Sequence, residues 1–306
     1  MMRSTAAEAP ERHERRRIRP ELFFVGSAIF HYLGPSFAVL LFARIEPLGV
    51  AWLRILVAAT VFAIWRRPWR RWRSARRDER ATILAWGVLL AGMNSVFYLA
   101  IDRLPLGTVA AIEFVGPIAI AAFAVRTLRN AVAIGLTLAG LALLSDVSLA
   151  GSPLGFLFAL ANMVLFAGYV IIGHRVSRHT GLTGVDGLAL AMIVAGVASA
   201  PIGMVAGLPA LTDPVALGAA IGVGVTSSVI PYVFDQLAMR RLARETYALM
   251  TALLPATATV IGLLILAQRP QLAELLGIGL VVIAIVVHRP VSAEKTYEER
   301  EKVSDG

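Results

Sequence analysis

The chain has 306 residues, of which 58% are hydrophobic and only 16% are charged, a composition outside the range of soluble globular proteins. Its formal net charge is +9, but the charges are concentrated near the two ends of the chain and in short segments between apolar runs. There is no cysteine, which excludes disulfides and thiolate metal sites. These properties exclude a soluble protein and predict an integral membrane protein.

Apolar segments dominate the sequence between a basic N-terminal arm (1–20) and a polar tail (289–306). A helix that crosses a membrane needs about 20 apolar residues. Ten segments meet this requirement: 22–43, 48–65, 81–101, 106–125, 130–147, 153–173, 184–206, 215–238, 245–267 and 271–288. The sequence therefore predicts an all-α integral membrane fold with ten transmembrane helices.

The distribution of basic residues predicts the orientation in the membrane. With the N-terminus inside, 25 of the 29 Lys and Arg residues lie in cytoplasmic segments and 3 lie in outer loops. The basic run 66–80 could bind nucleic acid or anionic lipid, but every other inner segment is basic too, which favours a loop that sets topology. We expect both termini in the cytoplasm, a lipid bilayer as surroundings and no nucleic-acid partner.

One stretch of the chain occurs twice. Residues 97–117 align without a gap to residues 235–255, with an odd number of predicted crossings between the two copies. The identical pairs are Leu99/Leu237, Ala100/Ala238, Arg103/Arg241, Leu104/Leu242, Thr108/Thr246, Ala110/Ala248 and Pro117/Pro255. Repeats of opposite orientation are typical of secondary transporters, whose substrate site lies near the midplane. We therefore expect two inverted five-helix repeats, 21–147 and 153–288, around a central cavity.

The residues that enzymes or ATP-driven pumps would need are missing. Both lysines, Lys295 and Lys302, lie in the tail, so the chain has no P-loop lysine. No HExxH or GxSxG motif occurs. The sequence predicts that the chain is not an enzyme, has no cofactor or metal, and draws on an ion gradient or on the gradient of its own substrate.

Glu113 is the deepest ionisable residue, seven residues into the fourth predicted span. Such a group is costly in a bilayer and marks a functional site by default. It could carry a proton or pair with the ammonium group of a substrate. The alternative is a structural ion pair with Arg54 in the second span.

Helix breaks accompany this acid. Gly116 and Pro117 follow Glu113 by about one turn, and Pro255 matches Pro117 in the second copy. Proline removes a helical hydrogen bond, and paired breaks in matching spans indicate a transport site. Pro35 and Pro231 break the first and eighth spans in the same way. We expect hinges at these residues.

Further polar residues lie within the predicted spans. As cavity-lining candidates we take His31, Asn94, Tyr98, Asn162, Tyr169, Tyr232 and Asp235. Single polar stripes of this kind also serve as contacts between helices. Asp235 lies near the cytoplasmic surface, where its side chain could instead reach water.

Three segments resemble a known group of proteins. GMNSVFYLAIDRLPLGTVAAIEFVGPIAIAAF (92–123), SSVIPYVFDQLAMRRLARETYALM (227–250) and EPLGVAWLRILVAATVFAIWRRPWR (46–70) are similar to the threonine/homoserine exporter family, in the EamA-type branch of the drug/metabolite transporter superfamily. This resemblance implies a ten-helix basket in a prokaryotic plasma membrane, with Glu113, Asn94, Tyr98 and Pro117 facing the cavity. Tyr232 and Asp235 would lie near its inner mouth.

The resemblance also implies a function. We expect export of small neutral amino acids such as threonine or homoserine, by proton antiport, with a possible homodimer through the fifth and tenth spans. Two alternatives are an exporter of another metabolite or toxic amphiphile, and a membrane scaffold or receptor that does not transport.

The sequence departs from the family at three places. Asp235 stands where the family tends to have Glu, Leu254 where it has Glu before the ninth-span proline, and Ala267-Gln268 where it has Gly-Glu. The loss of two acids bears on amino-acid specificity and on a second proton site.

Overall fold

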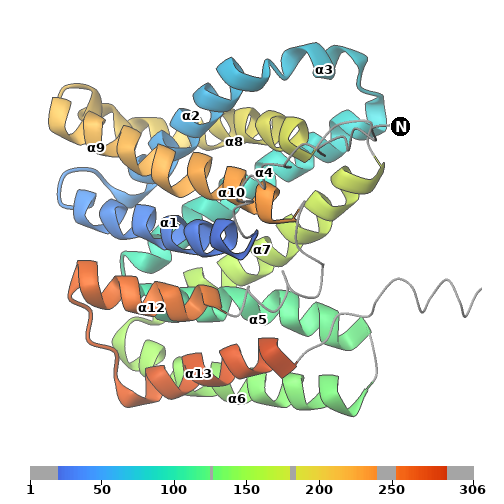
Figure 1. Cartoon of the computed structure of the whole chain (residues 1–306). Coiled ribbons are helices and arrows are strands. Elements are labelled where there is room, and N and C mark those ends of the chain that lie inside the picture. Colours follow the sequence, from blue (N-terminus) through green and yellow to red (C-terminus); the bar gives the residue numbers. More distant parts are fainter. Residues whose placement is uncertain (1–19, 125–126, 180–183, 240–252, 288–306) are drawn as a thin grey trace, which may run out of the picture.

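The computed structural model describes residues 20–124, 127–179, 184–239 and 253–287, and over these ranges the chain forms helices joined by short loops, with no strand (Figure 1). The α-helices are α1 (Pro20–Leu41), α2 (Pro47–Arg66), α3 (Trp69–Ser74), α4 (Arg77–Ile101), α5 (Leu106–Ala124), α6 (Leu128–Gly151), α7 (Pro153–His179), α8 (Gly184–Gly207), α9 (Pro214–Gly224), α10 (Ile230–Met239), α12 (Leu253–Leu266) and α13 (Leu272–Val287). A 3₁₀ turn, η1 (Leu208–Leu211), follows α8. A π-helical turn, η2 (Val225–Val229), joins α9 to α10.

Helical structure lies at each position predicted for a span. Four described segments are long and apolar enough to cross a membrane, namely Pro47–Arg66, Arg77–Ile101, Val185–Leu211 and Pro214–Phe234. The other predicted spans correspond to apolar helices that are shorter over the described residues. The prediction of an all-helical membrane protein is thus confirmed. The start of the predicted ninth span, 245–252, lies outside the described residues.

Helix starts follow local chemistry. Proline is the first residue of α2, α7 and α9, where its fixed φ is helical and the missing N–H costs nothing. Asp213 caps α9, because its side chain accepts hydrogen bonds from the backbone N–H groups of Val215 and Ala216.

Close helix pairs depend on small residues. A Cβ atom on Gly203 of α8 would lie 2.3 Å from Cβ of Trp52 on α2, and one on Gly49 of α2 would lie 2.5 Å from the carbonyl carbon of Ala206. The absence of these Cβ atoms lets α2 and α8 pack closely, as small residues do in membrane helices. In the same bundle α4 packs on α7 and α8, α5 on α7 and α12, and α6 on α13 at one edge (Figure 1).

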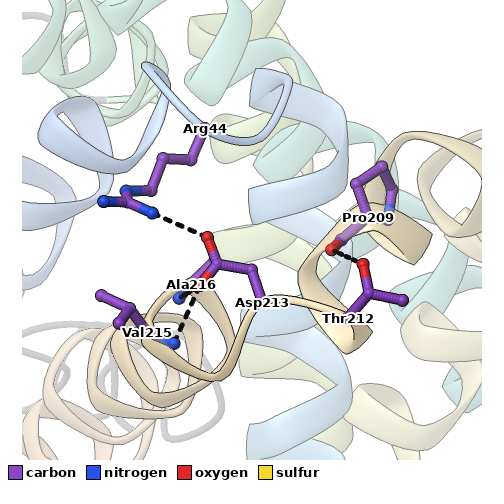
Figure 2. A network of polar contacts seen from close by, with 6 residues as sticks. All are labelled: Arg44, Pro209, Thr212, Asp213, Val215 and Ala216. Carbon is purple, nitrogen blue, oxygen red and sulfur yellow. Dashed lines mark hydrogen bonds and ion pairs between the residues drawn. The ribbon is translucent and has the colours of Figure 1, made fainter.

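Two ion pairs join the segments 20–151 and 153–287 at their ends. Nη1 of Arg44, just after α1, lies 2.7 Å from Oδ2 of Asp213, just before α9 (Figure 2). Nη2 of Arg66, at the end of α2, lies 2.8 Å from Oδ1 of Asp186, near the start of α8. The second pair fits the antiparallel packing of α2 and α8, whose opposite ends it brings together.

Candidate functional site

Glu113 lies on α5 with only 6% of its surface exposed, and it has a specific partner. Nδ2 of Asn162, on α7, donates a hydrogen bond to its Oε2 at 2.8 Å. Asn162 itself is fully buried. Two residues predicted as cavity-lining candidates on different helices are therefore in direct contact, in the interior of the bundle.

Arg54 has partners other than Glu113. The two side chains form no direct salt bridge, although they interact electrostatically. Instead Nε of Arg54 donates to Oγ of Ser228 at 2.8 Å, and Nη2 donates to the backbone carbonyl of Ser227 at 3.1 Å. The guanidinium carbon lies 5.5 Å from the centre of the Tyr98 ring, in cation–π contact. Both serines were missed by the sequence analysis, although they stand three and four residues before a predicted break.

The break at Pro231 explains the bond to Ser227. Proline has no N–H, so the carbonyl four residues earlier in the helix loses its usual donor. That carbonyl belongs to Ser227, within the π-helical turn η2, and Arg54 supplies the missing donor. A Cβ atom on Gly34 of α1 would lie 2.2 Å from Cβ of Ser227. The chain at Gly34 and Pro35 is therefore in close contact with η2, just before Pro231.

The other two prolines predicted as breaks lie within helices, Pro117 in α5 and Pro255 in α12. Pro117 cannot donate to the backbone carbonyl of Glu113, four residues before it, so the missing helical hydrogen bond lies at the acid itself. Gly116 faces α7, where a Cβ would meet the carbonyl of Met163 at 3.0 Å. Pro255 is buried, and residue 251, four positions earlier, lies outside the described residues.

Three buried polar atoms, on residues that interact with Glu113 or Arg54, have no hydrogen-bond partner. They are the hydroxyl oxygens of Tyr32 and Tyr98 and Oδ1 of Asn162. The carboxyl group of Glu113 also interacts electrostatically with Tyr32 and with Arg54. Buried polar groups are normally paired, so a cluster of unpaired ones indicates a place where a polar ligand or water binds.

The remaining candidates lie around this cluster or apart from it. Nδ2 of Asn94 donates to the carbonyl of Leu90 in its own helix, α4. His31, on α1, lies with its ring edge-on to Tyr32, at 5.2 Å between ring centres. Asp235 belongs to α10, but its side chain lies outside the described residues.

A second group is aromatic. Tyr169 on α7 stacks on Trp86 of α4, with ring centres 5.6 Å apart, and on Phe166 at 6.2 Å. Tyr232 packs against the same hydrophobic cluster. Nε1 of Trp86 is buried without a hydrogen-bond partner. The sequence analysis missed Trp86, whose only sequence signal is its spacing of two helical turns before Asn94.

The departure from the family at Ala267 and Gln268 has a structural consequence. Oε1 of Gln268 accepts a hydrogen bond from the backbone N–H of Leu106, the first residue of α5, at 3.0 Å. The amide oxygen of Gln268 thus accepts a hydrogen bond from the N-terminus of α5, as the carboxylate of a glutamate could. Ala267 has φ of 51°, in the left-handed region, and Gln268 N–H bonds to the carbonyl of Gly262, which together close α12.

Glu274 is a buried acid that the sequence analysis missed. It lies on α13 with 3% of its surface exposed. Its Oε1 accepts from the hydroxyl of Thr108 at 2.9 Å, and its Oε2 accepts from the backbone N–H of Gln271 at 2.8 Å. In the second bond, the side chain of the third helical residue accepts from the N–H of the residue that caps the helix, as in a capping box, and this spacing can be recognised in a sequence. Both oxygens of Glu274 are therefore used in hydrogen bonds within the fold.

In the described part of the chain no group of three His, Asp or Glu side chains could hold a metal ion.

Comparison with known proteins identifies relatives. Residues 153–288 match the model of the EamA-like transporter family. The threonine/homoserine exporter RhtA of Escherichia coli (strain K12) is 31% identical over 258 residues, covering 82% of this chain and 84% of that protein. RhtA of Salmonella typhimurium (strain LT2) is 30% identical over the same shares. A crystal structure of a protein 18% identical in sequence superposes with a TM-score of 0.53 over 88% of this chain and 96% of that one, a likeness of fold alone.

Proposed function

Because this chain belongs to the threonine/homoserine exporter family of EamA-type transporters, we propose that it exports small neutral amino acids, threonine or homoserine by preference, in exchange for protons. The chain has the apolar helices of a multi-pass membrane protein, and its family consists of transporters rather than enzymes. The bacterial relatives support a location in a prokaryotic plasma membrane.

The observation that carries this proposal is the buried carboxyl group of Glu113. It is held by Asn162, it lies at the break made by Pro117, and it has unpaired polar groups around it. A carboxyl group in such a place can hold either a proton or the ammonium group of a substrate, and alternation between the two couples their flows. Bending at Gly116, Pro117 and Pro255 would expose the site to each side of the membrane in turn.

Glu113→Gln tests the coupling, since glutamine keeps the size of the side chain and its hydrogen bonding but cannot titrate. We expect the variant to insert and fold, and to lose threonine efflux from liposomes or its response to a pH gradient. Glu274→Gln is the matched control, because both oxygens of that buried acid are used by the fold; it should keep pH-coupled efflux. Full coupling in the Glu113→Gln protein would show that this carboxyl is structural.

We also propose the ten-span topology, with two inverted repeats (21–147 and 153–288), a central cavity and both termini in the cytoplasm. The positive-inside distribution of Lys and Arg residues supports it. A reporter active only in the periplasm should be silent when fused after Arg73 and active when fused after Leu208. The reverse pattern would invert the orientation.

Tolerance assays separate the proposed substrate from the alternatives. Overexpression should raise the concentration of threonine or homoserine that inhibits growth, and raise it less for aromatic amino acids or cationic dyes. A rise only for dyes or other metabolites would favour a different exporter of the superfamily. No rise for any compound would favour a scaffold or receptor.

Homodimerisation through the fifth and tenth spans is a further part of the proposal. The corresponding helices, α6 and α13, pack on each other and expose large apolar side chains such as Leu138 and Leu276. Since the chain has no cysteine, Leu276→Cys provides a single site for crosslinking. A crosslinked dimer in membranes would support the proposal.

A further inference from the structure

Arg54 is a buried cation that forms no salt bridge, and the nearby Glu113 carboxyl group acts on it only through space. Only 6% of its surface is exposed, and the groups it contacts, Ser228, the Ser227 carbonyl and the Tyr98 ring, are all neutral. A buried charge is normally paired with an opposite charge. Its Nε and Nη2 are used in these bonds, whereas Nη1 has no hydrogen-bond partner among the described residues.

A second hydrogen-bond donor lies beside this cation. The Tyr98 hydroxyl, on the ring that Arg54 covers, is buried and has no hydrogen-bond partner. A guanidinium group and a hydroxyl group form a donor set suited to a carboxylate, which accepts several hydrogen bonds and carries a negative charge.

Acceptors gather on the side of α5 and α7. The Glu113 carboxyl and the free Oδ1 of Asn162 lie together, because Nδ2 of the same asparagine donates to Glu113. An ammonium group, which has three donors and no acceptor, fits this pair. The Arg54 guanidinium thus offers donors on α2, and the Glu113–Asn162 pair offers acceptors on α5 and α7.

Resting on the proposed function, we infer that Arg54, with the Tyr98 hydroxyl, binds the carboxylate of the transported amino acid while Glu113 and Asn162 hold its ammonium group. The site selects zwitterions. Simple amines and amino alcohols satisfy only the Glu113 side. Arg54 also keeps its bond to the Ser227 carbonyl, so substrate binding acts directly on the helix break at Pro231.

The test compares threonine with threoninol, the amino alcohol in which a hydroxymethyl group replaces the carboxylate. Both ligands are titrated against the purified full-length protein in detergent, by displacement of radiolabelled threonine or by the ligand-induced rise in melting temperature. The parent protein should bind threonine at least about thirtyfold more tightly than threoninol, since an unpaired buried charge is costly.

Arg54→Gln should weaken threonine binding by about the same factor and leave threoninol binding within about threefold. Arg54→Lys keeps the charge but cannot reproduce the planar donor set, so it should give an intermediate ratio. Arg66→Gln is the matched control on the same helix, because Arg66 pairs with Asp186 outside the cluster; it should keep the parent ratio.

The outcomes separate this inference from the proposed function. Equal affinity of the parent protein for threonine and threoninol would overturn the inference without any variant. An unchanged ratio in Arg54→Gln would also overturn it, and would reduce Arg54 to a donor for the Ser227 carbonyl. Failure of the parent protein to bind threonine or homoserine at all would overturn the proposed function, and the inference with it.

Discussion

Asn162 on α7 donates a hydrogen bond from Nδ2 to Oε2 of Glu113 on α5, at 2.8 Å, and both side chains are buried. The bond joins a helix of the first proposed repeat to a helix of the second. It fixes which way the Asn162 amide faces, and the amide oxygen is left buried without a hydrogen-bond partner.

Asn162→Leu should destabilise the protein and abolish efflux. The leucine has a similar size but leaves the Glu113 carboxyl without its donor, which costs about 1–3 kcal/mol in a buried site. Thermal unfolding in detergent and threonine efflux from liposomes measure the two effects. Thr137→Val is the control, since the Thr137 hydroxyl bonds only within its own helix. Equal losses of thermal stability and efflux in both variants would mean that the Asn162–Glu113 bond contributes no more to stability or transport than the hydrogen bond of Thr137.

Gly34→Ala should destabilise the protein by about 1–3 kcal/mol, because the new methyl group would overlap Ser227. Its Cβ would lie 2.2 Å from the Ser227 Cβ and 2.8 Å from backbone atoms, so α1 and η2 would have to separate. Gly222→Ala, on α9, meets no atom within 4 Å and should be neutral or stabilising by up to about 1 kcal/mol. The melting temperatures of the two variants test this prediction. Similar values would refute the close contact between Gly34 and Ser227.

Ala267→Gly should stabilise the protein by about 1 kcal/mol. Ala267 has φ of 51°, a conformation that costs any residue with a Cβ atom and that glycine adopts freely. Ala256→Gly, at an exposed position in α12, should lose about 1 kcal/mol, because glycine is a poor helix former. Opposite shifts in melting temperature are expected, and a loss of stability in both variants would contradict the left-handed backbone at residue 267.

Asp213→Asn should reduce the dependence of stability on acid pH. Backbone N–H donation from Ala216 and the Arg44 side chain hold the pKa of the Asp213 carboxyl below its usual 3.8 (Figure 2). A lowered folded-state pKa means that the stabilisation is present above 3.8 and is lost as the pH falls through the folded-state value. Asparagine still caps α9, so only the charge is removed.

The measurement is the melting temperature from about pH 7 to about pH 3, for the parent protein and for Asp213→Asn. The difference between them should shrink at the acid end. Because both partners are partly exposed, raised salt should also reduce the difference near pH 7. A difference that does not depend on pH would show that Asp213 acts through its shape alone.

The sequence by itself determined the helices, because a span needs a continuous apolar run and each run is local. It also singled out the prolines within the spans and Glu113 as candidates, since a proline or an acid in such a run stands out without any partner. Only the tertiary structure decided the partners: Asn162 and Glu113 are 49 residues apart, Arg54 and Ser228 are 174 apart, and Leu106 and Gln268 are 162 apart. No local pattern encodes these bonds. They arise because buried polar groups must be satisfied by whichever helices pack beside them.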